Sequence, residues 1–402
     1  MNYFLLGFTG LVFLLFAQGC ASQPDADPLK YFSEAEIEKA KSYHGVTYIV
    51  FFLRLGVTAA FFLVFIYSGA ARYLDRFIAQ KLSIYPLRVL AYFAIFYVIY
   101  MAVGLPLSFY RFYIVEHKYG FSNQTAGGWF LDVAKGGAVS LVLGGVLVTG
   151  LYLLIKISPK WWWLLSAGAF AVYLAIIILF KPVVIDPLFN KFTPMADDEM
   201  RAGIVSLAGK AGIEVGEVLV MDASRRTSHT NAYFTGWGST KRIVVYDTLL
   251  DNHTKPEVLS IVAHEIGHWR HSHIYIGFGI AVAGTVLALF IVKLAGGLLV
   301  ARMPLGADSL ASPASLVLVL MVLYVCGLFS MPVENAISRS FERQADAAAL
   351  ELTGDGRTFV EMQVKLARAN ASDPVPPAFC YFWFYSHPST MERIAMGERY
   401  GD

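Results

Sequence analysis

The five residues His264-Glu265-Ile266-Gly267-His268 have the types and the spacing needed to hold and use a metal ion. Apolar residues before them recur at helical spacing, which predicts that the pentapeptide lies on a helix. Residues four apart share one helix face, so His264 and His268 can bind one zinc ion through their imidazole nitrogens. Glu265 then lies beside a metal-bound water and can take its proton. We expect Gly267 to keep bulk away from the site.

A catalytic zinc ion needs a third protein ligand and one open position. The three cysteines, Cys20, Cys326 and Cys380, are too far apart in sequence to form a thiolate site or a disulfide framework. Among the other possible ligands, Glu342 is the best candidate. One zinc ion per chain is therefore expected, bound by two histidines and Glu342.

Asp346 lies four residues after Glu342 and shares its helix face, so it can accept an N–H from a ligand histidine and fix its tautomer. Between His268 and Glu342 the chain contains two long apolar stretches. The ligands can meet only if these stretches form a helical hairpin that returns the chain. His271 and His273 are less well placed on the predicted helix, and we interpret them as non-ligands.

Two other function classes stay open at this point. A membrane binding protein with a structural zinc ion would need a fourth ligand, and it would leave Glu265 without a role. A transporter would need polar or broken helices at the middle of the bilayer, and the apolar stretches offer little beyond Arg54 and Lys293. Peptide hydrolysis that a metal chelator stops would distinguish a zinc peptidase from the binding protein and from the transporter.

The composition places these residues in a membrane protein. Of the 402 residues, 56% are hydrophobic and 15% are charged, whereas soluble proteins have about 25% charged residues. Much of the surface must therefore face lipid. The formal net charge of +2 gives no reason to expect a nucleic-acid partner.

Seven apolar stretches are long enough to cross a bilayer as helices. They are residues 3–19, 46–68, 88–109, 137–155, 161–181, 274–299 and 313–335. The first runs into Cys20 in the manner of a lipoprotein signal, so a retained span and a cleaved signal are both compatible with it. This start predicts a bacterial inner membrane. Lysines and arginines divide evenly between the two sets of short connections, so the positive-inside rule does not fix the orientation.

Two regions follow from this pattern. Residues 1–181 form a predicted membrane region, and residues 182–402 form a predicted zinc metallopeptidase domain that includes the last two spans. Short apolar runs at 217–222, 231–235 and 241–246 predict a small antiparallel sheet. Helices broken near 373–377 follow the last span. The expected fold class is mainly α, a polytopic bundle of about seven spans with a small α+β domain.

The chain resembles the type 1 CAAX prenyl proteases, integral-membrane zinc metallopeptidases with bacterial members, and more distantly the HtpX-type proteases. The resemblance begins near residue 90. It is carried by Val115–Phe121 with Gln124-Thr125, Asp186–Pro194, Ser228–Phe234, Lys241–Val244 with Asp247–Leu250, residues 264–268, Phe341-Glu342 with Gln344–Asp346, and Tyr385–Pro388 with Glu392-Arg393.

The resemblance implies seven membrane helices around a water-filled chamber, with the zinc site at its opening and a peptide or protein as substrate. It also implies that Asn231, His387 and Arg393 belong to the active site. Asn231 on an edge strand would bind the substrate backbone. His387 would donate to the developing oxyanion, and Arg393 would orient a carboxylate of the site or a substrate terminus.

Overall fold

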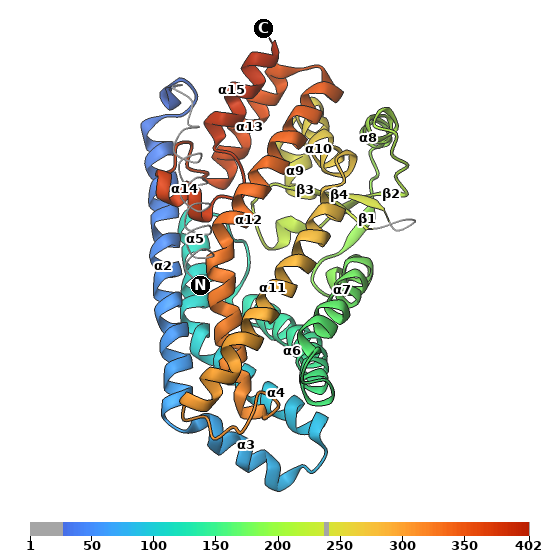
Figure 1. Ribbon diagram of the computed structural model, residues 1–402. Coiled ribbons are helices and arrows are strands. Elements are labelled where there is room, and N and C mark those ends of the chain that lie inside the picture. The colour runs from blue at the N-terminus through green and yellow to red at the C-terminus, as the bar shows by residue number, and fades with distance from the viewer. Residues whose placement is uncertain (1–26, 237–240, 402) are drawn as a thin grey trace, which may run out of the picture.

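The computed structural model describes residues 27–236 and 241–401, and long helices dominate it (Figure 1). The helices up to residue 188 are η1 (Pro28–Lys30), α2 (Glu34–Tyr67), α3 (Ala70–Lys81), α4 (Tyr85–Phe109), the π-helix η2 (Tyr110–Val115), α5 (Glu116–Tyr119), α6 (Ala126–Ile157), α7 (Trp162–Phe180), the π-helix η3 (Lys181–Ile185) and η4 (Asp186–Leu188). The later helices are α8 (Asp198–Lys210), η5 (Ala223–Arg225), α9 (Asp247–Asn252), α10 (Lys255–Arg270), α11 (His273–Arg302), η7 (Pro313–Ser315), α12 (Leu316–Thr353), α13 (Gly356–Asn370), α14 (Ala378–Phe384) and α15 (Thr390–Gly401).

Six helical segments of the described residues are long and apolar enough to cross a membrane. They are Glu34–Tyr67, Tyr85–Tyr119, Ala126–Ile157, Trp162–Leu188, His273–Arg302 and Pro313–Thr353. Each contains or overlaps one of the predicted stretches, which confirms the polytopic helical fold. The predicted stretch 3–19 lies outside the described residues. Apolar side chains such as Val64 and Leu294 stay exposed on these helices, as expected of a surface that faces lipid.

The hydropathy pattern does not predict α3, the helix that joins the first two of these segments. Its buried residues, Ala71, Leu74 and Ile78, recur at helical spacing on one face. That face packs against α4 and η7, at the end of the bundle opposite the C-terminus (Figure 1). Because charged residues such as Arg72, Asp75 and Arg76 interrupt its apolar residues, the helix lies outside the pattern that identifies a span.

The sheet has four strands in the order β1-β2-β4-β3. They are β1 (Phe192–Pro194), β2 (Glu217–Met221), β3 (Ala232–Thr235) and β4 (Arg242–Tyr246). β1 with β2 and β3 with β4 are antiparallel, but β2 and β4 are parallel. The prediction of an antiparallel sheet was therefore wrong for the central pair. After β2 the chain crosses to the far edge to form β3, and β4 then returns between the two. The three-residue strand β1 was not predicted.

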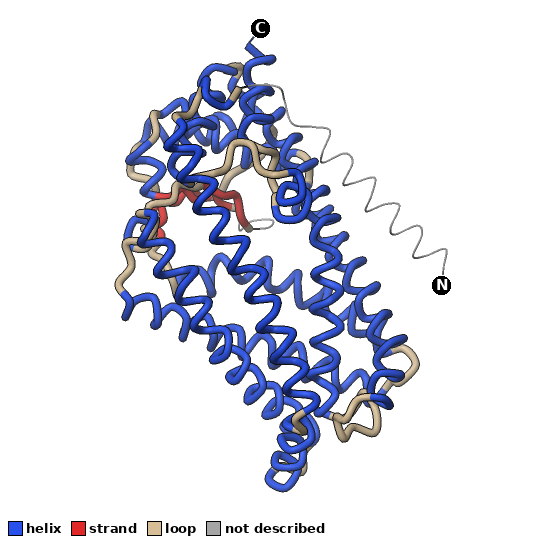
Figure 2. The backbone as a smooth tube through the Cα atoms, turned by 90° about the vertical axis from the view of Figure 1, so that its left-hand side faces the viewer, coloured by secondary structure: helices blue, strands red, loops and turns tan. Residues whose placement is uncertain are grey.

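The hairpin demanded by the metal site is present. α11 leaves the end of α10, and α12 returns as one helix of 38 residues, about 57 Å long. α12 carries the last span and continues into the acidic segment, which packs against α10. Figure 2 shows the strands near the end of the helical bundle that carries the C-terminus.

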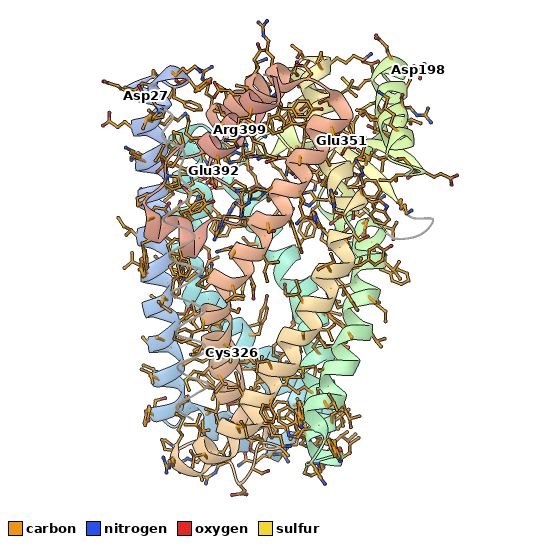
Figure 3. All side chains as sticks on the ribbon, turned by 45° about the horizontal axis from the view of Figure 1, so that its top comes forward. Asp27, Asp198, Cys326, Glu351, Glu392 and Arg399 are labelled. Carbon is orange, nitrogen blue, oxygen red and sulfur yellow. The ribbon has the colours of Figure 1, made fainter. Side chains whose placement is uncertain are left out.

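Charged residues gather at this end of the molecule. Asp198, Glu351 and Arg399 lie there, whereas Cys326 on α12 lies among the long helices (Figure 3). A core of residues from β2, β4, α8, α10, α12 and α13 holds this part together. As predicted, the C-terminal helices are broken around residues 373–377, because α13 ends at Asn370 and α14 begins at Ala378.

Candidate metal centre

α10 fixes the direction of the two histidines. Thr254 and Glu257 form a capping box at its start, which satisfies backbone N–H groups of the first turn. Val258 and Val262 are completely buried and lock the rotation of the helix against the core. The rings of His264 and His268 then lie one turn apart, with centroids separated by 4.8 Å.

Gly267 allows α10 to approach α12 closely. A Cβ at this position would lie 2.9 Å from the backbone oxygen of Ala345 and 3.0 Å from the Cβ of Ala348. From the sequence, we expected this glycine to keep bulk away from the site. Its contacts show a different reason, because the lack of a side chain lets the two ligand-bearing helices touch.

His264, His268 and Glu342 meet at one place, with one ligand atom of each within 4.8 Å of the others. The two Nε2 atoms are 3.1 Å apart. Glu342 Oε2 lies 3.2 Å from Nε2 of His264, and Oε1 lies 3.4 Å from Nε2 of His268. Tetrahedral coordination with bonds of about 2.0–2.1 Å separates ligand atoms by about 3.3–3.4 Å. The three groups therefore fit the coordination shell of a single divalent ion.

The electrostatics of the cluster also suit a cation. Glu342 Oε2 is buried and lacks a hydrogen bond of good geometry among the described residues. Burial lowers the pKa of His264, but Asp346 and Glu342 outweigh this effect and raise the pKa to about 10. The surroundings thus favour positive charge at His264, and a metal ion would supply that charge.

Asp346 and Arg393 contact the ligand His264 on the side away from the other two candidate ligands. Asp346 Oδ1 lies 2.8 Å from Nδ1 of His264, so the carboxylate can fix the tautomer that leaves Nε2 free for a metal. Arg393 Nε donates to Asp346 Oδ2 at 2.8 Å. Arg393 therefore orients a carboxylate of the site. A role in orienting a substrate terminus also remains a prediction.

His273, which we interpret as a non-ligand, contacts one of the candidate ligands. Its Nδ1 lies 3.0 Å from Nδ1 of His268, and its ring stacks on Phe341 at 4.2 Å. Ser272 has a left-handed backbone with φ 58°, which breaks the helix and turns His273 back toward the site. Helical spacing alone could not show this position.

Glu265 borders a pocket of about 330 Å³ beside the cluster, together with Phe234 and His268. Burial raises the pKa of Glu265, and the two neighbouring histidines offset part of this rise. A carboxylate whose pKa is raised toward neutrality is suited to proton transfer. The geometry therefore leaves Glu265 on the open side of the three candidate ligands.

His387 and Asn231, which the resemblance also implies, come from the segment after α14 and from the residue before β3. His387 Nε2 is 3.4 Å from Glu342 Oε2, and Ser386 Oγ is 2.9 Å from the other ring nitrogen. Asn231 is exposed and immediately precedes β3, which is an edge strand. The side-chain oxygen of Asn231 accepts from the N–H of Ala232 at 2.9 Å. The roles of these residues remain predictions.

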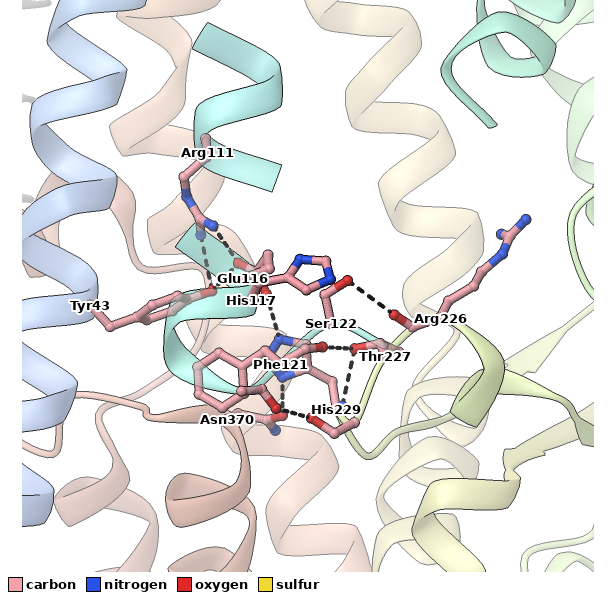
Figure 4. Close-up of polar contacts among 12 residues, drawn as sticks. Tyr43, Arg111, Glu116, His117, Phe121, Ser122, Arg226, Thr227, His229 and Asn370 are labelled. Carbon is pink, nitrogen blue, oxygen red and sulfur yellow. Dashed lines mark hydrogen bonds and ion pairs between the residues drawn. The ribbon is translucent and has the colours of Figure 1, made fainter. Parts of the chain in front are cut away.

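A partly buried polar network ties the chain before β3 to the membrane helices (Figure 4). Glu116 pairs with Arg111, accepts from the hydroxyl of Tyr43 at 2.7 Å and lies 3.3 Å from Nε2 of His229. The other nitrogen of His229 faces Asn370 Oδ1 at 2.7 Å. Because both ring nitrogens face oxygen acceptors, this arrangement suits a protonated imidazole.

Further contacts attach the chain before β3 to the membrane helices. Ser122 and Thr227 form an isolated antiparallel bridge, and the N–H of Ser228 donates to the carbonyl of Phe121 at 3.2 Å. Arg226 donates to Asp132 on α6 at 2.8 Å. The segment that leads into the edge strand is therefore held by α5, α6 and the connection between them.

The sequence of the chain also matches models of known protein families. Residues 194–399 match the model of peptidase family M48, and residues 21–191 match the model of the CAAX prenyl protease N-terminal region, described as five membrane helices. The chain belongs to peptidase family M48. It is thus a membrane metallopeptidase of the CAAX prenyl protease type.

Individual M48 relatives extend over most of the chain. The metalloprotease YhfN of Bacillus subtilis is 31% identical over 93% of this chain and 88% of its own length. CAAX prenyl protease 1 of Saccharomyces cerevisiae is 32% identical over 73% of this chain and 68% of its own length. The crystal structure of Ste24p from S. mikatae superposes with a TM-score of 0.82, at 24% identity, over 98% of this chain and 97% of that one. The fold is therefore shared along nearly the whole length.

Proposed function

We propose that this M48 protein is a zinc-dependent endopeptidase of a bacterial inner membrane, which cleaves peptides or proteins in extended form. The convergence of His264, His268 and Glu342 beside the open-side carboxylate Glu265 supports this proposal. Two imidazoles and one carboxylate form a donor set of catalytic zinc sites, which keep a position open. Bound zinc would polarise the scissile carbonyl and make water more acidic.

The protein's own groups have separate tasks in this proposal. Glu265 takes a proton from the attacking water and passes it to the leaving amine. His387 donates a hydrogen bond from Nε2 to the oxygen that becomes negatively charged, and Ser386 supports this tautomer by donating to Nδ1. Asp346 and Arg393 hold His264 in its ligand orientation.

The substrate backbone would bind along β3. Among the described residues this strand pairs with β4 alone, so an extended peptide could add to its other edge through backbone hydrogen bonds. Asn231 lies at the start of this edge. Phe234, on the same strand, borders the pocket of Glu265, so a peptide on β3 would pass the catalytic group. A site closed for a structural role would not leave Glu265 beside an open pocket.

The decisive experiment replaces Glu265 by Gln in the full chain. The variant should keep a stoichiometric metal content, measured by elemental analysis, and lose roughly 10²- to 10⁴-fold in casein or peptide hydrolysis, because the amide cannot accept the proton. A chelator such as o-phenanthroline should stop the unsubstituted enzyme. Undiminished hydrolysis by Glu265→Gln would refute the assignment of the base.

A further inference from the structure

One face of α12 contacts the chain that runs from α14 to α15 (Figure 1). Four polar residues on α12 are spaced four, three and four positions apart, which places them on the same helix face. They are Asn335, Arg339, Glu342 and Asp346. Two of their contacts belong to the candidate metal centre, since Glu342 lies beside His387 and Asp346 accepts from Arg393. The first two residues of the series lie outside that centre.

Arg339 is a buried cation whose partners are backbone carbonyls. Its side chain is 3% exposed, and within the described part of the chain no carboxylate forms an ion pair with it. Its guanidinium donates to the carbonyls of Tyr381 at 3.2 Å and of Tyr385 at 2.6 Å, and it lies 4.6 Å from the ring centre of Tyr381. Arginine is rarely buried so completely unless it is paired. The two carbonyls are therefore the groups that this buried charge serves.

These carbonyls belong to the end of α14. The helix stops at Phe384, so the carbonyl of Tyr385 has no N–H partner within it. One turn earlier on α12, the side-chain amide of Asn335 donates to the carbonyl of Trp383 at 2.6 Å. Two side chains on one face of α12 therefore fix the end of α14.

The end of α14 in turn sets the position of His387. Only Ser386 separates His387 from Tyr385, and the His387 side chain is exposed, so packing around its ring does little to hold it. Beyond His387 the chain is fixed again, because the N–H of Ser389 donates to Glu392 Oε2 at 2.7 Å and the N–H of Glu392 donates to Ser389 Oγ at 3.2 Å. His387 thus lies on a short segment that is held at both ends.

We propose that Arg339 is a positioning residue of the peptidase, which holds the end of α14 so that Nε2 of His387 stays beside the candidate ligand Glu342. This inference rests on the proposed function, in which His387 donates to the oxygen that becomes negatively charged. Arg339 and Glu342 lie one turn apart on α12, so one rigid helix sets the distance between the metal ligand and the donor. A donor of this kind acts only when it is well placed, and a shift of about 1 Å can cost roughly 10²-fold in rate.

The first test measures kcat and KM of the full, zinc-loaded chain in detergent, with an internally quenched peptide as substrate. Arg339→Met should lower kcat roughly 10- to 100-fold with little change in KM, because substrate still binds while the donor is misplaced. Elemental analysis should still find one zinc ion per chain. Arg339→Lys should recover part of the loss, since its ammonium group can donate to one of the carbonyls.

Hydrogen exchange followed by mass spectrometry tests the position of the segment without using activity. Residues 378–389 should exchange faster in Arg339→Met than in the unsubstituted protein, because the end of α14 has lost its donor. Unchanged exchange of this segment would show that Arg339 does not hold it, and would overturn the proposal.

Arg343→Met is the matched control, because it removes the same charge one turn later on α12. The Arg343 side chain is 49% exposed and lies 3.7 Å from Glu392. Since exposed ion pairs contribute little, this variant should lower kcat by less than about fivefold. Equal losses of kcat in Arg339→Met and Arg343→Met would assign the effect to charge alone and contradict the proposed positioning role.

A double-mutant cycle shows whether Arg339 acts through His387. His387→Ala alone should lower kcat roughly 10²- to 10³-fold. In that background Arg339→Met should cause almost no further loss, because the donor that it misplaces is already absent. If Arg339→Met does not fold, the same cycle with Arg339→Lys decides the question.

The outcomes of the cycle separate this inference from the proposed function. If His387→Ala is slow but the two losses multiply, Arg339 does not act through His387, and the proposed peptidase mechanism stands without it. If His387→Ala cleaves as fast as the unsubstituted enzyme, the assigned oxyanion donor is wrong, and the role of Arg339 falls with it. Loss of zinc from Arg339→Met would show that Arg339 supports the metal ligands instead.

Discussion

Asp346 contacts both the candidate ligand His264 and the guanidinium of Arg393. It is completely buried, lies 2.8 Å from Nδ1 of His264 and accepts from Arg393 on its other oxygen at 2.8 Å. A carboxylate in this position holds the imidazole in one orientation and makes it a better ligand. Arg393 in turn keeps the buried carboxylate from standing as an uncompensated charge.

Asp346→Asn should weaken metal binding by about 10- to 100-fold, because the amide cannot hold the His264 tautomer as the carboxylate does. Competition with a chelator of known affinity measures the change. Glu351→Gln is the matched control, since Glu351 lies on the same helix but is exposed in a surface ion pair with Arg270. Equal metal affinity of Asp346→Asn and Glu351→Gln would show that Asp346 does not support the ligand.

Residue spacing predicted part of this site and missed the rest for a physical reason. His264 and His268 were predicted to lie side by side because one regular helix sets their geometry. Glu342 followed from the chemistry that a third ligand must have. His273 stays a predicted non-ligand, but its contact with His268 was not predicted, because the left-handed residue Ser272 redirects the chain and nothing in the helical pattern encodes that turn.

At the scale of elements, the metal centre depends on how closely α10 and α12 approach. Gly267→Ala should destabilise the protein by about 1–3 kcal/mol, because the added methyl group meets the backbone of α12. Thermal unfolding in detergent should show a lower Tm together with a lower metal content. Gly277→Ala on α11 is the control, since a Cβ there meets no atom within 4 Å. Because alanine has a higher helix propensity than glycine, equal losses of Tm in both variants would show that the contact with α12 is not their cause.

The network around Glu116 makes a second prediction at this scale. Glu116→Gln removes the charge that balances Arg111 and His229, whose side chains are mostly buried. Removing one partner of a buried ion pair typically costs about 3–5 kcal/mol. The Tm of this variant should therefore fall well below that of Lys118→Gln, a change to a neighbouring side chain outside the network. A loss no larger than that of the control would show that the network carries little stability.

The pH dependence of this network follows from His229. Burial lowers the pKa of His229, but its hydrogen bonds to Glu116 and Asn370 outweigh this effect and raise it overall. A raised pKa stabilises the folded state at low pH, and this contribution disappears as the pH rises through the folded-state value. The Tm difference between the unsubstituted protein and Glu116→Gln should therefore narrow toward alkaline pH.

The elements themselves differed in how well the sequence predicted them. The membrane spans were predicted because lipid requires a long run of apolar residues, and such a run can be recognised within one segment of the sequence. The parallel pairing of β2 with β4 was not predicted. It arises because the chain forms β3 at the far edge of the sheet before it returns to form β4 beside β2. Strand pairing of this kind is a property of the whole path, and residue patterns within each strand do not contain it.

The whole molecule is built around α12, which belongs to both of its large cores. Leu316 to Val319 pack in the membrane core, and Ala349 and Leu350 pack in the core around the sheet. The ligand Glu342 and its support Asp346 lie between these two anchors. The division of the chain near residue 181 remains a prediction, and this helix shows that the later part is itself rooted in the membrane bundle.

This architecture predicts which surface positions share one side of the membrane. Asp198 and Glu351 are separated by two spans, α11 and α12, so they should face the same compartment. Asp308 lies in the connection between those spans and should face the opposite one. All three side chains are exposed, so a cysteine at each position can react without unfolding the protein.

Single cysteines at these three positions, in a background with Cys326 and Cys380 replaced by Ser, should separate into two groups when intact cells are treated with an impermeant maleimide. The parent background measures the contribution of Cys20. Asp198→Cys and Glu351→Cys should react alike, and Asp308→Cys should react oppositely, whichever way the protein is inserted. If Asp308→Cys reacts together with Asp198→Cys, α11 does not cross the bilayer. The hairpin would then fail to return the chain through the membrane, and the meeting of Glu342 with His264 and His268 would need another explanation.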